Sequence, residues 1–141
     1  MKPKYLYHGS GKKLDVLIPR RARDLGKDPS NMLKGIYASS LRKEAIIMGI
    51  FSCKGVKGAG IHVKGKRKID AIIYNSWPKQ KYFYLYTLPS RTFKEMPKGS
   101  AQWASLKSLK PLKIEKLLVK NYLHWIRKAT KKEKSEFNKL R

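Results

Sequence analysis

Strand-type and helix-type hydrophobic patterns alternate along the first part of the chain. Residues 4–8 combine tyrosine and leucine in a pattern typical of a short strand, and the Gly-Ser-Gly that follows ends it. Residues 14–19 form a second extended piece, and residues 20–34, which contain glycine, proline and asparagine, predict a loop. Apolar residues at helical spacing between 45 and 51 then predict a helix that begins at a serine cap, Ser39 or Ser40.

Strand-type patterns dominate the second half of the chain. The predicted strands are residues 61–63, 69–74, 83–88, 102–106 and 112–119. Residues 122–126 return to helical spacing, and Thr130 with Glu133 fits a capping box for a final helix. We therefore predict a single α+β domain over residues 1–141, with largely antiparallel strands, one early helix and helices at the C-terminal end. About residues 128–141 are basic and are expected to form a C-terminal helix that frays.

The balance of charged residues indicates a kind of binding partner. Thirty-four Lys and Arg residues face nine Asp and Glu, which gives a formal net charge of +25. Such an excess destabilises a compact chain unless anions are close, and it favours contact with a polyanion such as nucleic acid, an anionic membrane or a phosphorylated ligand. The longest apolar runs are far too short to span a bilayer, so no membrane partner is predicted.

Cysteine and histidine usage narrows the chemistry. Cys53 is the only cysteine, so no intramolecular disulfide and no cysteine metal site is predicted. The three histidines are far apart and lack companions at ligand spacing, so no metal cofactor is predicted either. With no secretory signal pattern at the start, we expect a cytoplasmic protein, located in the host-cell interior if it is viral.

Basic residues that are mixed with aromatic ones predict a nucleic-acid surface. Lysines bind phosphates, and exposed aromatic rings stack on bases. The alternative is that the aromatic residues belong to the core and the lysines only form a solvated surface. The residues that we assign to nucleic-acid contact are Lys64, Lys66, Arg67, Lys68, Lys110 and Lys113.

Two early segments are candidates for a small-molecule site. His8 ends a predicted strand and is followed by Gly9, whose lack of a side chain lets a ligand approach the backbone. Tyr37 lies just before the predicted helix, where an aromatic ring serves as a stacking platform beside an anion-attracting helix N-terminus. The alternative is that His8 is a partly buried histidine and Tyr37 a core aromatic.

These segments, Tyr7-His8-Gly9-Ser10 and Leu33-Lys34-Gly35-Ile36-Tyr37-Ala38-Ser39, resemble paired motifs of the ADP-ribosyltransferase family. The similarity is to the branch of diphtheria toxin and poly(ADP-ribose) polymerase. That branch has a histidine-glycine-serine on its first strand, a glycine-isoleucine-tyrosine before a helix, and a glutamate that opens a later strand. Residues 100–105 stand at the third position, and the resemblance covers roughly residues 4–118. It implies a split, largely antiparallel β-sheet core.

The resemblance also implies NAD as a substrate and a set of residues that bind it. His8 would hydrogen-bond a ribose hydroxyl, the Gly9 backbone would pair with the nicotinamide carboxamide, and Tyr37 would stack on the cationic nicotinamide ring. Arg20, with Arg21 and Arg23, would meet the pyrophosphate. Ser10 and Ser39 complete the predicted binding set, and His8, Tyr37 and Gln102 make up the predicted catalytic set.

The chain departs from the family at the third motif. Gln102 stands where the family has glutamate, so it can hydrogen-bond a hydroxyl but supplies no charge to a developing oxocarbenium ion. Ile47 or Met48 occupies the place of a second tyrosine that closes on the nicotinamide ring. Glu95 is the nearest upstream carboxylate, in a position that does not open a strand.

Three functions follow from these residues. The first is an NAD-dependent enzyme that transfers ADP-ribose to a nucleic acid or a nucleic-acid-associated protein. The second is a catalytically inactive module of the same fold that binds nucleic acid through its basic surface. The third is a relative of the RNA 2′-phosphotransferases, which would need several basic residues converging on the pocket. Residue 102 distinguishes the first from the second.

Overall fold

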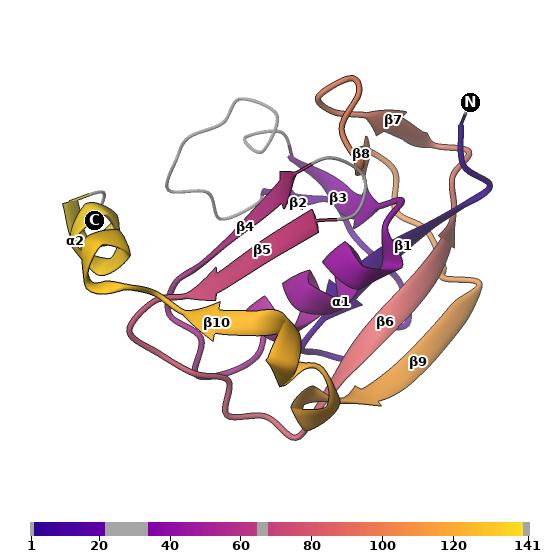
Figure 1. Cartoon of the computed structure of the whole chain (residues 1–141). Coiled ribbons are helices and arrows are strands. Elements are labelled where there is room, and N and C mark those ends of the chain that lie inside the picture. Colours follow the sequence, from indigo (N-terminus) through magenta and orange to yellow (C-terminus); the bar gives the residue numbers. More distant parts are fainter. Residues whose placement is uncertain (1, 22–33, 65–67, 140–141) are drawn as a thin grey trace.

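Two β-sheets and two α-helices make up the part of the chain that the computed structural model describes, residues 2–21, 34–64 and 68–139 (Figure 1). The strands of the larger sheet are β1 (Tyr5–Ser10), β2 (Arg20–Arg21), β3 (Lys34–Ser39), β6 (Tyr82–Pro89), β7 (Phe93–Glu95), β8 (Gln102–Ser105) and β9 (Lys113–Leu118). Their order is β7-β8-β3-β1-β6-β9, with β2 paired to β3. The smaller sheet has the order β10 (Ile126–Lys128), β5 (Lys68–Ile73) and β4 (Ala59–Lys64).

The helix α1 (Arg42–Phe51) lies between the two sheets and forms the main core with both (Figure 1). Its Ile46, Ile47 and Ile50 are fully buried, and they pack with Ile73 of β5 and Phe83 of β6. These isoleucines recur at helical spacing, so one helix presents apolar side chains to both sheets. Cys53 belongs to this core, and its burial raises the pKa of the thiol to about 11.

A second core covers the other face of the larger sheet. Leu6, Tyr86 and Leu88 are fully buried there. The Tyr86 hydroxyl donates to the carbonyl of Lys12 at 2.9 Å and accepts from the N–H of Leu14 at 2.6 Å. The buried hydroxyl therefore both donates and accepts a hydrogen bond, and these bonds hold the segment after β1 on this face.

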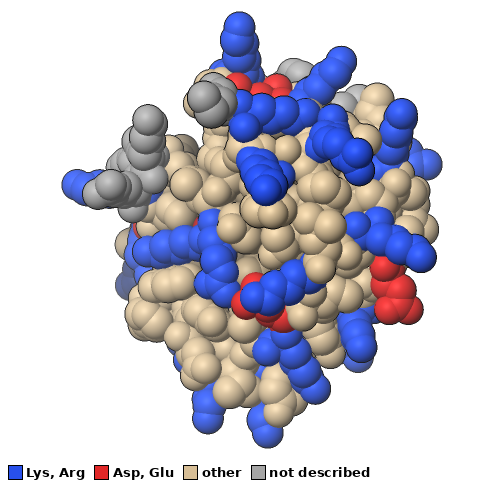
Figure 2. Space-filling model, turned by 90° about the vertical axis from the view of Figure 1, so that its right-hand side faces the viewer, with Lys and Arg blue, Asp and Glu red and all other residues tan. Residues whose placement is uncertain are grey.

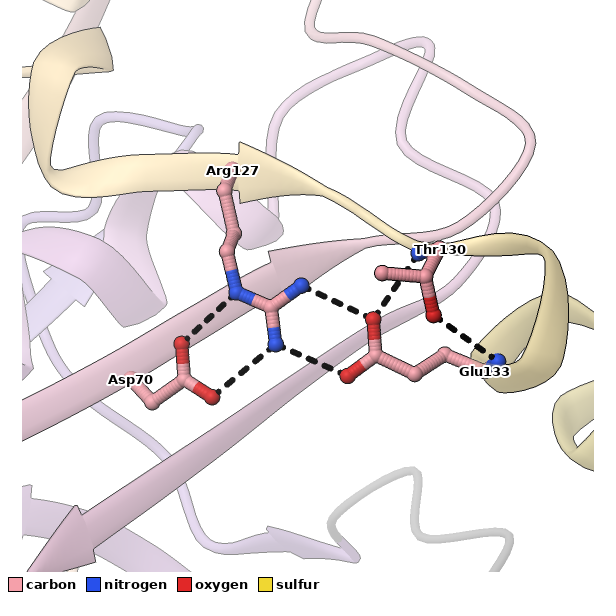
Figure 3. A network of polar contacts seen from close by, with 4 residues as sticks. All are labelled: Asp70, Arg127, Thr130 and Glu133. Atoms are coloured by element: carbon pink, nitrogen blue, oxygen red, sulfur yellow. Dashed lines mark hydrogen bonds and ion pairs between the residues drawn. The ribbon is translucent and has the colours of Figure 1, made fainter.

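The C-terminal helix α2 (Lys131–Lys139) is attached to the smaller sheet by a polar network (Figure 3). Arg127 donates to both carboxylate oxygens of Asp70, at 3.0 and 3.1 Å, and to both of Glu133, each at 2.8 Å. The Thr130 N–H donates to Glu133 at 2.8 Å and the Glu133 N–H donates to the Thr130 hydroxyl at 3.2 Å, which confirms the predicted capping box. The hydrogen bonds from Arg127 lower the pKa of Glu133 to about 2.

Most of the predicted elements are confirmed. The early helix and all five predicted strands of the second half are present, in a single α+β domain with mostly antiparallel sheets. The predicted helix at 122–126 is wrong: two short 3₁₀ turns, Val119–Asn121 and Leu123–Trp125, lead into β10, which pairs in parallel with β5. Strand β7 was not predicted. In the described ranges no helix is both long and apolar enough to cross a membrane.

The start of α1 and the early loop also differ from the prediction. The helix begins at Arg42 with Leu41 as its N-cap, and no side chain caps it there. The Ser39 hydroxyl instead accepts from the Leu41 N–H at 2.9 Å, and the Ser40 N–H bonds to the carbonyl of Ala101. Both ends of the predicted loop at 20–34 are strand, and residues 22–33 lie outside the described ranges.

Candidate functional site

The three motif segments lie on three neighbouring strands of the larger sheet. Tyr7 of β1 is paired with Ser39 of β3, and Ser39 is paired with Gln102 of β8. The three residues therefore form one row across the sheet, although 95 positions separate the first from the last. Antiparallel strands place directly opposed residues about 5 Å apart, so the ends of the motifs share one small area.

The sheet opens at this place, between β1 and β3. The pairing of β1 with β6 covers six residue pairs, from Tyr5 to Ser10, whereas the pairing of β1 with β3 is limited to Tyr7 with Ser39. Beyond Tyr7 the two strands no longer form a ladder. The β1 residues that follow, His8 to Ser10, are therefore not paired with β3, and we call this interruption of the ladder the opening.

The His8 side chain spans this opening. Its Nδ1 lies 2.6 Å from the backbone carbonyl oxygen of Tyr37. A carbonyl can only accept a hydrogen bond, so Nδ1 carries the proton and Nε2 of the neutral ring is an acceptor. Burial lowers the pKa of His8, the hydrogen bond to Tyr37 opposes this, and the charge of Arg20 lowers it further. The imidazole is therefore neutral at pH 7 and presents one nitrogen lone pair.

Arg20 brings a positive charge close to His8. It lies in β2, opposite Gly35 of β3, and its side chain is exposed. No ion pair between residues of the described ranges involves it. Arg20 is thus an exposed cation near His8, and its contact with an anionic ligand stays a prediction. Arg23 lies outside the described residues.

Tyr37 and the two serines have defined local roles. Tyr37 is half-buried on β3, opposite Ala104 of β8, and burial raises the pKa of its hydroxyl, which keeps it protonated. The hydroxyl of Ser39 is buried and is used in the turn into α1, and that of Ser10 accepts from the Lys12 N–H at 3.1 Å. Both serines lie at the site, and their contact with a ligand stays a prediction.

Gln102 opens strand β8, as the third motif requires, and its amide is held by the neighbouring hairpin. Its Nε2 donates to the carbonyl of Met96 at 3.1 Å, and its own backbone carbonyl accepts from the Met96 N–H at 2.9 Å. Glu95 of β7 is paired with Trp103. Successive residues of a strand point to opposite faces, so Glu95 lies on the face opposite to Gln102 and does not replace the missing carboxylate.

Close packing of α1 requires glycine at position 9, and the sequence did not indicate this. A Cβ at this position would lie 2.0 Å from the carbonyl oxygen of Ala45 and 2.6 Å from the amide nitrogen of Gly49. Glycine is therefore required so that α1 can lie directly on β1. The predicted role of the Gly9 backbone toward nicotinamide is a separate matter and stays a prediction.

The predicted nucleic-acid residues do not form one group. Lys64 and Lys68 are paired in the backbone register of β4 and β5, in the smaller sheet. Lys113 belongs to β9 of the larger sheet, Lys110 precedes it, and both are exposed. Lys66 and Arg67 lie outside the described residues. Figure 2 shows Lys and Arg spread over the β9 side of the molecule, with acidic atoms at only a few places.

A hollow that the sequence did not predict lies beside the candidate site. Its volume is about 420 Å³. The residues that line it are Gly11, Lys12, Lys13, Gln80, Lys81, Tyr82 and Tyr84. The signal in the sequence was the alternation of tyrosines after Lys81, which places Tyr82 and Tyr84 on the same face of β6.

The motif residues offer a neutral histidine acceptor, a half-buried phenol, an exposed guanidinium and an amide, with no carboxylate among them. By strand alternation Tyr37 and Gln102 share one face of the sheet, and His8 lies on the other. Such a set can bind a ribose hydroxyl and an anionic group. No group of three or more metal-ligating side chains occurs in the part of the chain that the structure describes. No protein-family model, no curated protein and no solved structure matches this chain.

Proposed function

We propose that the opening between β1 and β3 binds NAD, and that the protein transfers ADP-ribose from NAD to a nucleic acid or a nucleic-acid-associated protein. One observation carries the proposal. The three segments that resemble ADP-ribosyltransferase motifs lie on the adjacent strands β1, β3 and β8, and the sheet opens between the first two. A chance likeness of short motifs gives no reason for this juxtaposition.

The residues of the site suit the parts of NAD that the resemblance assigns to them. The unprotonated Nε2 of His8 can accept a hydrogen bond from a ribose hydroxyl, because Nδ1 is already committed to the Tyr37 carbonyl. The Arg20 guanidinium can bind the pyrophosphate with two parallel hydrogen bonds. The Tyr37 ring is the aromatic group that the resemblance assigns to nicotinamide. Strand alternation places it on the face opposite to His8, so the bound NAD would pass between the two strands.

In the proposed reaction, the bond between nicotinamide and C1′ of the ribose breaks, and its electron pair leaves with nicotinamide. The nucleophile of the acceptor then bonds to C1′ and gives up its proton. The transition state has oxocarbenium character, which a carboxylate stabilises by charge. Gln102 supplies no charge, and losing one preorganised group of this kind typically costs about 3 kcal/mol, or about a hundredfold in rate.

The inactive binding module is the second candidate, and a specific contact favours it. The Gln102 amide donates to the Met96 carbonyl, so it fastens the β7–β8 hairpin. A residue with this structural task can be kept without any catalytic role. The relation to RNA 2′-phosphotransferases, which would need several basic residues converging on the pocket, stays a prediction.

Isothermal titration with NAD, combined with an assay of nicotinamide release in the presence and absence of DNA and RNA, tests the proposal. His8→Ala and Tyr37→Ala should abolish NAD binding, whereas His62→Ala, on the exposed strand β4 of the other sheet, should leave it unchanged. Equal NAD binding by the natural protein and by His8→Ala would contradict the proposal. NAD binding without nicotinamide release under any condition would favour the binding module.

Gln102→Glu separates the enzyme from the module. If the amide occupies the carboxylate position, the substitution should raise nicotinamide release about a hundredfold and change NAD affinity only a few-fold. Loss of the amide bond to Met96 should cost about 1 kcal/mol of stability. Glu95→Gln is the matched control, and it should leave the rate unchanged because Glu95 lies on the other face. An unimproved rate in Gln102→Glu would show that the third motif is misplaced.

A further inference from the structure

We infer that the hollow lined by Lys12, Lys13, Lys81, Tyr82 and Tyr84 binds single-stranded nucleic acid, with a base stacked on Tyr82. The choice of nucleic acid as the occupant rests on the proposed function, and the position of the site rests on the structure alone. None of the residues to which the sequence assigned nucleic-acid contact lines this hollow.

The hollow has the charge of a phosphate-binding site. Three lysines line it, and Lys116 of β9 lies beside it, with its Nζ over the Tyr82 ring at 4.2 Å from the ring centre. None of these four lysines takes part in an ion pair with a residue of the described ranges. Four uncompensated cations around one small volume attract a backbone that carries one negative charge per nucleotide.

The hollow also has an aromatic surface that a base can stack on. The Tyr82 side chain stays 36% exposed, although it belongs to a strand whose neighbouring Phe83 is fully buried. Lys81 and Lys116 both hold an ammonium group within 6 Å of this ring, at 5.5 and 4.2 Å. A base that stacks on the ring takes the place of the Lys116 ammonium group over it. The displaced ammonium group can then pair with a phosphate of the same strand, so stacking and charge pairing occur together.

Only an unpaired base has a free face for this ring. In a duplex both faces of each base are covered by the stack, so an exposed tyrosine gains nothing from it. The hollow is open to solvent, and its volume of about 420 Å³ suits a few groups and not a long groove for a duplex. Single-stranded nucleic acid is therefore the partner that fits both the charge and the ring.

The hollow and the candidate NAD site are neighbours on one strand. Ser10 is paired with Tyr84, and Tyr84 is paired with Lys116, so these three residues form a row across β1, β6 and β9. His8 lies two residues before Ser10, on the same face of β1, at a distance of about 7 Å along the strand. A strand bound in the hollow would thus pass close to the ribose of NAD, as an acceptor must.

Fluorescence anisotropy with a labelled thymidine oligonucleotide of about 12 nucleotides, in the absence of NAD, tests this inference. Tyr82→Ala should weaken binding about tenfold, and Tyr82→Phe, which keeps the ring, should restore most of the affinity. Tyr5→Ala is the matched control, because Tyr5 is an exposed tyrosine, 42%, with a lysine Nζ 5.4 Å from its ring centre. It lies at the opposite end of β1 and should bind like the natural protein.

Two further measurements keep the inference open to failure. Lys116→Gln should reduce the slope of log affinity against log salt by about 0.7, and Lys4→Gln should not. Heparin, a polyanion without bases, should bind Tyr82→Ala as well as it binds the natural protein. Equal losses in Tyr82→Ala and Tyr5→Ala, or tighter binding of a duplex of the same length, would overturn the inference. Oligonucleotide binding by a chain that fails to bind NAD would keep it and overturn the proposed function.

Discussion

The junction of β1 with β3 and the junction of β5 with the C-terminal segment are held together in very different ways. At the first, one residue pair and one hydrogen bond from His8 to a backbone carbonyl connect two neighbouring strands. At the second, three residue pairs and two hydrogen bonds from Arg127 to Asp70 connect β10 with β5. Two more from Arg127 to Glu133, together with the capping box, hold α2 to β10 (Figure 3).

The comparison shows which junction is held by many contacts and which is held by few. The exposed network around Arg127 is redundant, and each of its hydrogen bonds can be lost while others remain. The His8 bond is partly buried and has no neighbour that repeats it along the opening. A place with few backbone contacts, a neutral histidine and a nearby cation is where a ligand can complete the structure.

The largest effect is expected for Gly9→Ala, which acts on the strand that carries the first junction. The new methyl group would lie within 3 Å of three backbone atoms of α1, and backbone cannot move aside as a flexible side chain can. We expect a loss of about 3 kcal/mol or more in the free energy of unfolding, measured with urea.

Gly60→Ala serves as the control for that substitution. Gly60 is also in a strand, and the nearest atom to its added Cβ would be at 3.7 Å, which is ordinary contact. Its stability should be unchanged or higher by up to about 1 kcal/mol. A Gly9→Ala protein as stable as Gly60→Ala would mean that α1 does not lie on β1 as described.

His8→Ala is the direct test of the first junction. It removes the bond to the Tyr37 carbonyl together with the packing of the ring near Tyr86, whose ring centre is 6.1 Å away. The free energy of unfolding should fall by about 1–2 kcal/mol. The exposed His62 provides the comparison, and His62→Ala should change stability by less than about 0.5 kcal/mol. Equal losses of stability in His8→Ala and His62→Ala would show that the His8 hydrogen bond does not stabilise the junction of β1 with β3.

The two junctions should also respond to pH in separate windows. The pKa of His8 is lowered from 6.5 in the folded state, so the unfolded chain binds the proton first as the pH falls. Its contribution is present above pH 6.5 and is lost as the pH falls through the folded pKa, with a slope of at most about 1.4 kcal/mol per pH unit. Urea unfolding of the natural protein and of His8→Ala at several pH values measures it, and identical pH profiles would contradict it.

Glu133 also stabilises the folded state at higher pH, but its contribution is lost in a lower pH range than that of His8. Its pKa is lowered from 4.5 to about 2, so its support for α2 is complete above pH 4.5 and is lost as the pH falls toward 2. Proton NMR of the histidine ring and of the glutamate side chain would locate both titrations. Titration of Glu133 near 4.5 would show that Arg127 does not hold it in solution.

The smallest effect is expected for Glu133→Gln at neutral pH. The network is exposed and Asp70 still holds Arg127, so global stability should hardly change. Amide hydrogen exchange in residues 131–139 should nevertheless become severalfold faster, because the capping box is weakened. Glu136→Gln, a neighbouring exposed glutamate outside the network, should leave the exchange unchanged. Equal exchange in both variants would show that the box contributes nothing.

Local signals in the sequence were enough for most of the fold. The isoleucine spacing of α1 and the Thr130–Glu133 box depend on residues within one or two helical turns, so they could be predicted. Strand β10 could not, because Ile126 pairs with Ala71, and nothing in the three residues of β10 themselves indicates that partner. Strand β7 could not be predicted either, because it is only three residues long and too short to show a strand pattern of its own.

The residues of the candidate site come from the resemblance and stay a prediction, and their arrangement could not be predicted from the sequence. The resemblance named His8, Tyr37 and Gln102, but the single pairing of β1 with β3 depends on how the whole sheet assembles. The amide bond from Gln102 to Met96 and the approach of Gly49 to Gly9 are likewise tertiary. The hollow beside Tyr82 needs β1, β6 and β9 together, so no single segment could indicate it.

The parallel pairing of β10 with β5 has a consequence for the synthesis of the protein. Ile126 of β10 belongs to the same core as Ile47 and Ile73, so this core cannot close until the ribosome has made residue 126. Until then, the cluster around α1 lacks one of its buried members. The nascent chain therefore carries an incomplete apolar cluster for most of its translation, and chaperones that hold exposed apolar segments can bind it during that time.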